Sequence, residues 1–133
     1  MSVLFDSDAL IEVVRRREPF DSYAQALLAD APVLFVSAIS YYEVLRGVEV
    51  AHAFAQQRRL LLLDSQLQVL PISKAVAERA TTLYLNLRAQ GLLLPDADLL
   101  IAATALAHGL ALATRNQRHF SRIPSLSLAN WDA

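Results

Sequence analysis

Short apolar runs alternate with longer stretches of helical periodicity along this chain. The runs are hydrophobic at every position, which is typical of strands covered on both faces of a parallel sheet. This alternation predicts an α/β fold around a central parallel sheet of four to five strands. We expect strands at residues 3–5, 33–37, 67–70 and 110–114, with 126–128 as a fifth. We expect helices at residues 9–17, 23–29, 39–49, 51–63, 74–89 and 97–108, and a short helical turn at 115–120.

Polar residues before the apolar periodic segments predict the helix starts. The expected caps are Ser7 or Asp8, Asp21 or Ser22, Ser73, and Asp96. A break is expected near Gly47. The helix from residue 97 is apolar on every face apart from Thr104, which predicts a buried helix.

Composition narrows the class of protein. The chain has 133 residues, so we expect one domain at 1–133. Hydrophobic residues make up 55% of it and the mean hydropathy is +0.34, which indicates a large core or apolar surface covered by a partner. It has no cysteine, no apolar run of about 18 residues, and no signal-peptide pattern at its start. We therefore expect a cytoplasmic protein without membrane association. The net charge of -1 gives no global basic field that would attract nucleic acid.

Four oxygen-bearing side chains are expected at one edge of the sheet. Asp6 and Asn116 follow strands, Glu43 lies in the first two turns after the second strand, and Asp98 lies in the first turn of a helix that returns down the sheet. The carboxyl ends of parallel strands share one edge, where ligands bind. Each residue alone has an ordinary explanation, as a helix cap, a surface pair of Glu43 with Arg46, or a turn. Their convergence from four segments favours a site.

The chemistry of this expected site favours a divalent metal ion. Clustered carboxylates repel one another unless a cation lies between them. Oxygen ligands without sulfur select a hard cation, Mg²⁺ or Mn²⁺. Such an ion neutralises charge at a phosphodiester and makes water more acidic, so hydrolysis of a nucleic-acid strand is the natural reaction. The sequence contains no Ser-His-Asp or Cys-His pattern with supporting context.

Several basic residues lie near the same edge. Arg115 and Arg118 follow the strand at 110–114, and Arg46 lies one turn beyond Glu43. They are candidates for contacts with the RNA or DNA backbone, although an ordinary solvated basic face explains them equally well. His119 is a weaker candidate for the same role.

Four motifs resemble the PIN-domain ribonucleases, and most of all the VapC toxins of bacterial type II toxin–antitoxin pairs. They are residues 4–8 (LFDSD), 36–47 (VSAISYYEVLRG), 98–103 (DLLIAA) and 113–120 (ATRNQRHF), and the tail 123–131 (IPSLSLANW) is similar to a VapC ending. The resemblance covers essentially the whole chain. It implies a PIN-like α/β/α sandwich that forms a homodimer. It also implies Mg²⁺- or Mn²⁺-dependent endonuclease action on RNA, and neutralisation by a VapB-like antitoxin.

The resemblance assigns roles to individual residues. The acids of the family correspond to Asp6, Glu43 and Asp98 as metal ligands, with Glu43 ligating the ion or orienting the attacking water. Ser7 corresponds to the polar residue after the first acid. The fourth position is often Asp in the family and is Asn116 here, which removes one charge and puts tight binding of a second metal ion in doubt.

Two alternatives remain open on the sequence. Residues 5–8 (FDSD) also fit the D-x-D motif of haloacid-dehalogenase-type phosphatases, with Asp6 as nucleophile, Asp8 as acid and base, and Lys74 in support. Against this, no Gly or Thr follows Asp8 and the role of Glu43 is unexplained. The second alternative is a PIN fold that has lost activity, which the neutral Asn116 keeps open.

Overall fold

The sheet has four parallel strands in the order β3-β2-β1-β4. The structure is a computed structural model that describes residues 2–131. Residues 1, 132 and 133, which the predicted domain includes, lie outside that range. The strands are β1 (Val3–Phe5), β2 (Leu34–Ser37), β3 (Leu67–Leu70) and β4 (Ala111–Ala113).

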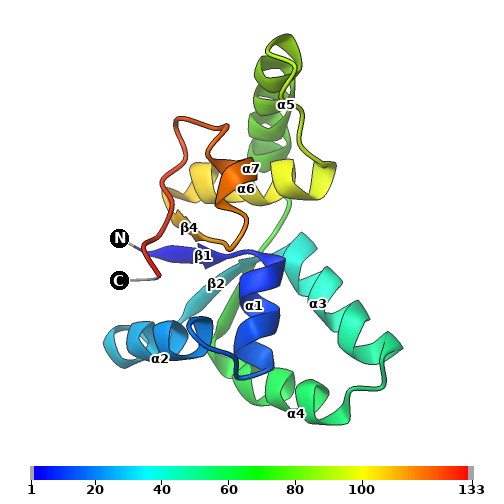
Figure 1. Cartoon of the computed structure of the whole chain (residues 1–133), viewed down its shortest axis with the longest axis vertical. Helices are drawn as coiled ribbons and strands as arrows, with labels where there is room; N and C mark the ends of the chain where they lie inside the picture. The colour runs from blue at the N-terminus through cyan, green and yellow to red at the C-terminus, as the bar shows by residue number, and fades with distance from the viewer. Residues whose placement is uncertain (1, 132–133) are drawn as a thin grey trace.

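Helices cover both faces of the sheet, as the apolar strands predict (Figure 1). On one side lie α1 (Ser7–Val14), α2 (Phe20–Asp30), α3 (Ala38–Val50) and α4 (Phe54–Leu63), the last followed by a 3₁₀ turn at Asp64–Gln66. On the other side lie α5 (Lys74–Ala89), α6 (Asp96–His108) and α7 (Gln117–Phe120). This is the expected α/β/α sandwich. Among the described residues, no helix is both long and apolar enough to cross a membrane.

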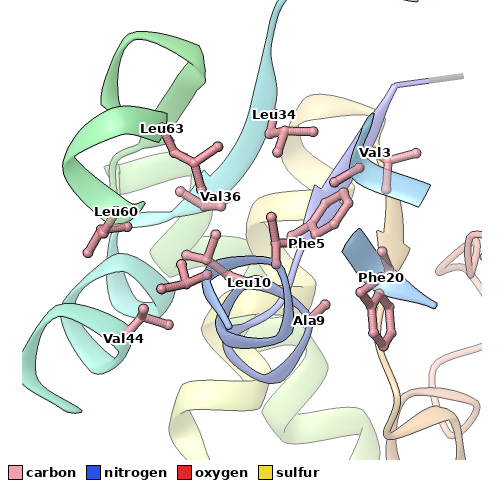
Figure 2. Packing of buried hydrophobic residues seen from close by; sticks show 14 of the residues in the cluster. Val3, Phe5, Ala9, Leu10, Phe20, Leu34, Val36, Val44, Leu60 and Leu63 are labelled. Carbon is pink, nitrogen blue, oxygen red and sulfur yellow. The ribbon is translucent and has the colours of Figure 1, made fainter. Parts of the chain in front are cut away.

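Alternate residues of the central strand feed two separate cores. Val3 and Phe5 of β1 pack with α1 to α4, whereas Leu4 packs with α5, α6 and α7. Figure 2 shows the first core, in which Phe5 of β1 lies near Ala9 of α1 and Phe20 of α2. Because side chains of a strand alternate between its faces, this arrangement also fixes the direction of the residue that follows each strand.

Several predicted boundaries agree with the structure. β1, β3 and α5 begin and end where the sequence predicts, and Ser73 caps α5 by accepting from the backbone N of Val76 at 3.2 Å. Gly109 ends α6 with a φ of 64°, a left-handed conformation that suits glycine.

Other predictions about the elements are wrong. The first helix begins at Ser7 and is capped by Asp6, not by Ser7 or Asp8. α2 begins directly after Pro19, which occupies the cap position without a side-chain hydrogen bond, and Asp21 contacts Arg16 and Arg59 instead of capping. Asp96 is the first residue of α6, and Pro95 occupies the cap position.

Two further predictions, a break near Gly47 and a fifth strand at 126–128, are also wrong. Gly47 lies inside α3, which continues to Val50, because an exposed helical glycine weakens a helix without ending it. The expected fifth strand at 126–128 is reduced to a single parallel bridge between Leu112 and Leu128.

Candidate active site

The predicted site residues meet at the carboxyl edge of the sheet. Asp6 directly follows β1, Asp98 lies in the first turn of α6, and Glu43 lies in the second turn of α3. Asn116 lies between β4 and α7. Together these four side chains line a cavity of about 130 Å³, which Ser7, Asp8, Ile101 and Phe120 complete.

Asp6 is the most buried of the four, with 4% of its surface exposed. Its Oδ1 accepts a hydrogen bond from the backbone N of Ala9 at 2.8 Å, and its Oδ2 accepts one from the hydroxyl of Thr114. Burial raises the pKa of Asp6 to about 6, although both hydrogen bonds act to lower it. Asp6 therefore caps α1 and also lines the cavity, so the cap and the site residue are the same side chain.

Ser7 fixes Glu43. The Ser7 hydroxyl donates to Oε1 of Glu43 at 2.6 Å and ties the start of α1 to α3. Hydrogen bonds to a charged acceptor are short and strong, so one carboxylate oxygen of Glu43 is held in place.

Asp98 and Asn116 both contact His119. Oδ2 of Asp98 lies 3.3 Å from Nδ1 of His119, and Nδ2 of Asn116 lies 2.8 Å from the same nitrogen. Burial raises the pKa of Asp98, whereas the contact with His119 lowers it. His119 is thus a partner of the site residues themselves, a role that sequence reasoning missed.

Thr114 and Trp131 are also missed by sequence reasoning. The hydroxyl of Thr114 accepts from the backbone N of Asn116 at 2.9 Å while it donates to Asp6. The indole Nε1 of Trp131 donates to the backbone carbonyl of Thr114 at 2.8 Å. A polar residue at the end of an otherwise apolar strand is the signal that marks Thr114, whereas no sequence signal links Trp131 to the site.

The three predicted arginines lie outside the residues that line the described cavity. Arg115 pairs with Glu12 of α1 at 3.1 Å and lies over the ring of Phe20. Arg46 donates to the hydroxyl of Tyr42 at 3.1 Å, and Arg118 is exposed on α7. Arg115 is therefore part of the packing of α1 and α2, and the other two remain surface cations.

The donor set of the cavity fits a hard divalent cation. The charges of Asp8 and Asp98 raise the pKa of Asp6, and the charges of Glu43 and Asp8 raise the pKa of Asp98. A cation among these oxygens would offset that repulsion. Within residues 2–131, no three His, Asp or Glu side chains are grouped closely enough to hold a metal ion by themselves. Water and substrate oxygens would complete the shell, as is usual for Mg²⁺.

A family model described as the PIN domain matches residues 3–126, nearly the whole chain. The chain belongs to the PIN-domain family. Its fold and its edge carboxylates are those expected from the four sequence motifs, so the resemblance to this family is confirmed. The haloacid-dehalogenase alternative is wrong, because the family match covers the chain from β1 to the segment after α7.

This PIN domain is similar to several known proteins along its full length. It is 31% identical to "Ribonuclease VapC2" of Rickettsia felis over 99% of each chain. A chain in the crystal structure of VapBC2 from Rickettsia felis, bound to a DNA fragment from their promoter, superposes with a TM-score of 0.86 at 28% identity. That match covers 99% of this chain and 100% of the other. A chain of a toxin-antitoxin complex from Klebsiella pneumoniae superposes with a TM-score of 0.73 at 34% identity, covering 94% and 95% of the two chains.

Proposed function

We propose that this PIN domain is a metal-dependent endoribonuclease, the toxin of a VapBC-type toxin–antitoxin pair. The observation that carries the proposal is the convergence of Asp6, Glu43, Asp98 and Asn116 on one cavity at the sheet edge. The full-length similarity to a protein named Ribonuclease VapC2 supports RNA as the substrate class.

Asp6, Glu43 and Asp98 would hold a divalent ion, Mg²⁺ or Mn²⁺. When bound, the ion supplies charge neutralisation at the phosphodiester and makes water more acidic. The protein contributes rigid oxygen atoms for this purpose. The contacts of Asp6 with Ala9 and Thr114 fix its carboxylate in one orientation, so little reorganisation accompanies binding.

Glu43 would ligate this ion or orient the attacking water. Ser7 holds its Oε1, which leaves Oε2 for either role. Ser7 and Asn116 then hold the water and the phosphate by hydrogen bonds. Asn116 carries no charge, so it adds nothing to the attraction of a second ion.

The partners follow from the same proposal. We expect an antitoxin to cover the groove between α3 and α4, which Leu45 and Leu61 line and which measures about 150 Å³. We expect a second copy of this chain at the groove between α5 and α6, which Tyr84 and Leu99 help to line and which measures about 350 Å³. Exposed apolar side chains near these grooves support both expectations, since large apolar patches on a surface mark sites of association.

Replacement of two carboxylates tests the function. D6N and D98N keep the shape of the side chains and remove their charge, so both should fold and lose metal-dependent RNA cleavage. E49Q, on the exposed side of α3, is the matched control and should cleave at the wild-type rate. Full activity in D6N or D98N would overturn the proposal.

Calorimetry separates the active enzyme from a PIN fold that has lost activity. The wild-type protein without antitoxin should bind Mn²⁺, and D98N should bind it more weakly. A wild-type protein that binds no Mn²⁺ and leaves RNA intact would favour the inactive alternative.

A further inference from the structure

His119 contacts two site residues through a single ring nitrogen. Its Nδ1 lies 3.3 Å from Oδ2 of Asp98 and 2.8 Å from Nδ2 of Asn116. A nitrogen of a neutral imidazole carries either a proton or a lone pair. Nδ1 can therefore donate to Asp98 or accept from Asn116, but it cannot do both. The tautomer of His119 decides which contact is a hydrogen bond.

The carboxylate favours the proton on Nδ1. An ionised Asp98 offers acceptors alone, and a hydrogen bond to a charged acceptor is about twice as strong as a neutral one. The other tautomer would place the lone pair of Nδ1 against a carboxylate oxygen. The side chain of His119 is 36% exposed, so water can donate to Nε2 when the proton lies on Nδ1.

This tautomer changes what Asn116 presents to the cavity. A proton on Nδ1 would meet the NH₂ group of Asn116, and two donors would face each other. Rotation of the carboxamide by about 180° relieves this, because its oxygen and nitrogen have nearly the same size and exchange without repacking. Oδ1 of Asn116 then accepts from Nδ1 of His119, in a bond shared with Asp98, and the NH₂ group turns toward the cavity.

We propose that His119 is a positioning residue that holds Asp98 through Nδ1–H and makes Asn116 present its NH₂ group to the cavity. There the NH₂ group donates to a phosphate oxygen of the RNA strand, a step that rests on the proposed function. Asn116 is then a phosphate donor and not a fourth oxygen ligand. The divalent ion is left to the three carboxylates.

The tautomer can be read directly in the metal-free protein. NMR chemical shifts of the ring nitrogens distinguish a protonated from an unprotonated nitrogen. Above the titration range of histidine, Nδ1 of His119 should be protonated and Nε2 unprotonated. His52 and His108 are exposed and serve as internal reference signals in the same spectrum. A proton on Nε2 of His119, or on both nitrogens, would overturn the proposal.

D98L tests whether Asp98 causes this tautomer. Leucine has no acceptor, so Nδ1 loses its charged partner and the NH₂ group of Asn116 can donate to it, and the proton should move to Nε2 in the spectrum of this variant. An unchanged Nδ1 signal in D98L would show that another group sets the tautomer, and the proposal would fail.

Two variants of His119 test the consequence for cleavage. Asparagine places its NH₂ group near the position of Nδ1, whereas glutamine places it near Nε2. H119N should therefore retain most of the RNA cleavage rate, and H119Q should lose about tenfold in kcat/KM, equal to about 1.4 kcal/mol. Equal rates in the two variants would contradict the positioning role. If the wild-type protein cleaves no RNA, the proposed function fails while the NMR result still decides the tautomer.

Discussion

The hydroxyl of Thr114 donates a hydrogen bond to Oδ2 of Asp6, and these residues lie 108 positions apart in the chain. Thr114 follows β4 and Asp6 follows β1, and the two strands are paired in parallel with Phe5 opposite Ala113. The residues after two paired parallel strands are neighbours, so the sheet itself creates this contact. Asp6 thereby receives a hydrogen bond that favours its charged form, whereas burial alone would favour the neutral acid.

We predict that T114V weakens the site through Asp6. Valine has nearly the shape of threonine but removes the donor to Asp6 and the acceptor for the backbone N of Asn116. Loss of a hydrogen bond to a buried charge costs about 1.5–3 kcal/mol. T114V should bind Mn²⁺ at least about tenfold more weakly by calorimetry, by the conversion of 1.4 kcal/mol per factor of ten. T114S keeps the hydroxyl and should bind like the wild type, and equal binding by T114V would contradict the role of this contact.

The metal-free protein should become more stable as the pH falls from neutrality. The pKa of Asp6 is about 6 in the folded state against 3.8 as its ordinary value. Between these values the folded state binds more protons than the unfolded state, so the free energy of unfolding rises as the pH decreases through 6. The gain between about pH 7 and about pH 5 is on the order of 1 kcal/mol. The raised pKa of Asp98 acts in the same direction.

Urea unfolding at the two pH values measures this gain. D6N has no carboxyl group at position 6 and should lose the larger part of the pH dependence. D30N, which replaces an exposed carboxylate at the end of α2, should keep it. A D6N protein with the full pH dependence would show that Asp6 is not the titrating group.

The sequence predicts the elements well where local signals and packing agree. β3 and α5 are predicted to the residue, because Pro71, Ser73 and Gly91 mark their ends. The predicted fifth strand at 126–128 is an apolar alternating pattern that pairs with β4 at Leu112 alone. The segment does not become a full strand because a strand needs a neighbouring strand along its whole length. Tertiary structure decides whether that neighbour is present, and the local pattern does not show it.

In the candidate site too, some features can be predicted from the sequence and others depend on tertiary packing. Parallel topology alone brings Asp6, Glu43, Asp98 and Asn116 to one cavity, so these positions are predictable. The ion pair of Arg115 with Glu12 is not predictable from the sequence, because it depends on α1 packing so that Glu12 faces the segment after β4. The role of His119 depends on the turn that brings α7 back over α6, which no local pattern specifies.

Conversion of Asn116 to aspartate should strengthen metal binding. N116D adds a fifth carboxylate to the cavity, beside Asp6, Asp8, Glu43 and Asp98, which attracts a divalent cation and repels the other carboxylates when the cation is absent. We expect Mn²⁺ affinity to rise on the order of tenfold, equal to about 1.4 kcal/mol, and the metal-free melting temperature to fall. Calorimetry and thermal unfolding of the same sample measure both effects. N116A, which adds no charge, is the control, and an affinity gain shared by N116A would contradict the electrostatic cause.

Trp131 acts on the site through Thr114, from the last described residue of the chain. Its indole Nε1 donates to the carbonyl of Thr114, and its ring packs on Phe20 with 4.4 Å between the ring centroids. W131F keeps an aromatic ring on Phe20 and removes the donor. The free energy of unfolding should fall by about 1 kcal/mol, the net value of one hydrogen bond.

RNA cleavage should fall further than this change in stability explains, because the carbonyl and the hydroxyl of Thr114 belong to one residue and Asp6 depends on that hydroxyl. Cleavage measured well below the melting temperature separates the two effects. F54L, at an exposed ring on α4 away from the cavity, is the matched aromatic control and should leave the cleavage rate unchanged. If W131F loses stability but cleaves RNA at the wild-type rate, Trp131 fastens the chain end without positioning Thr114.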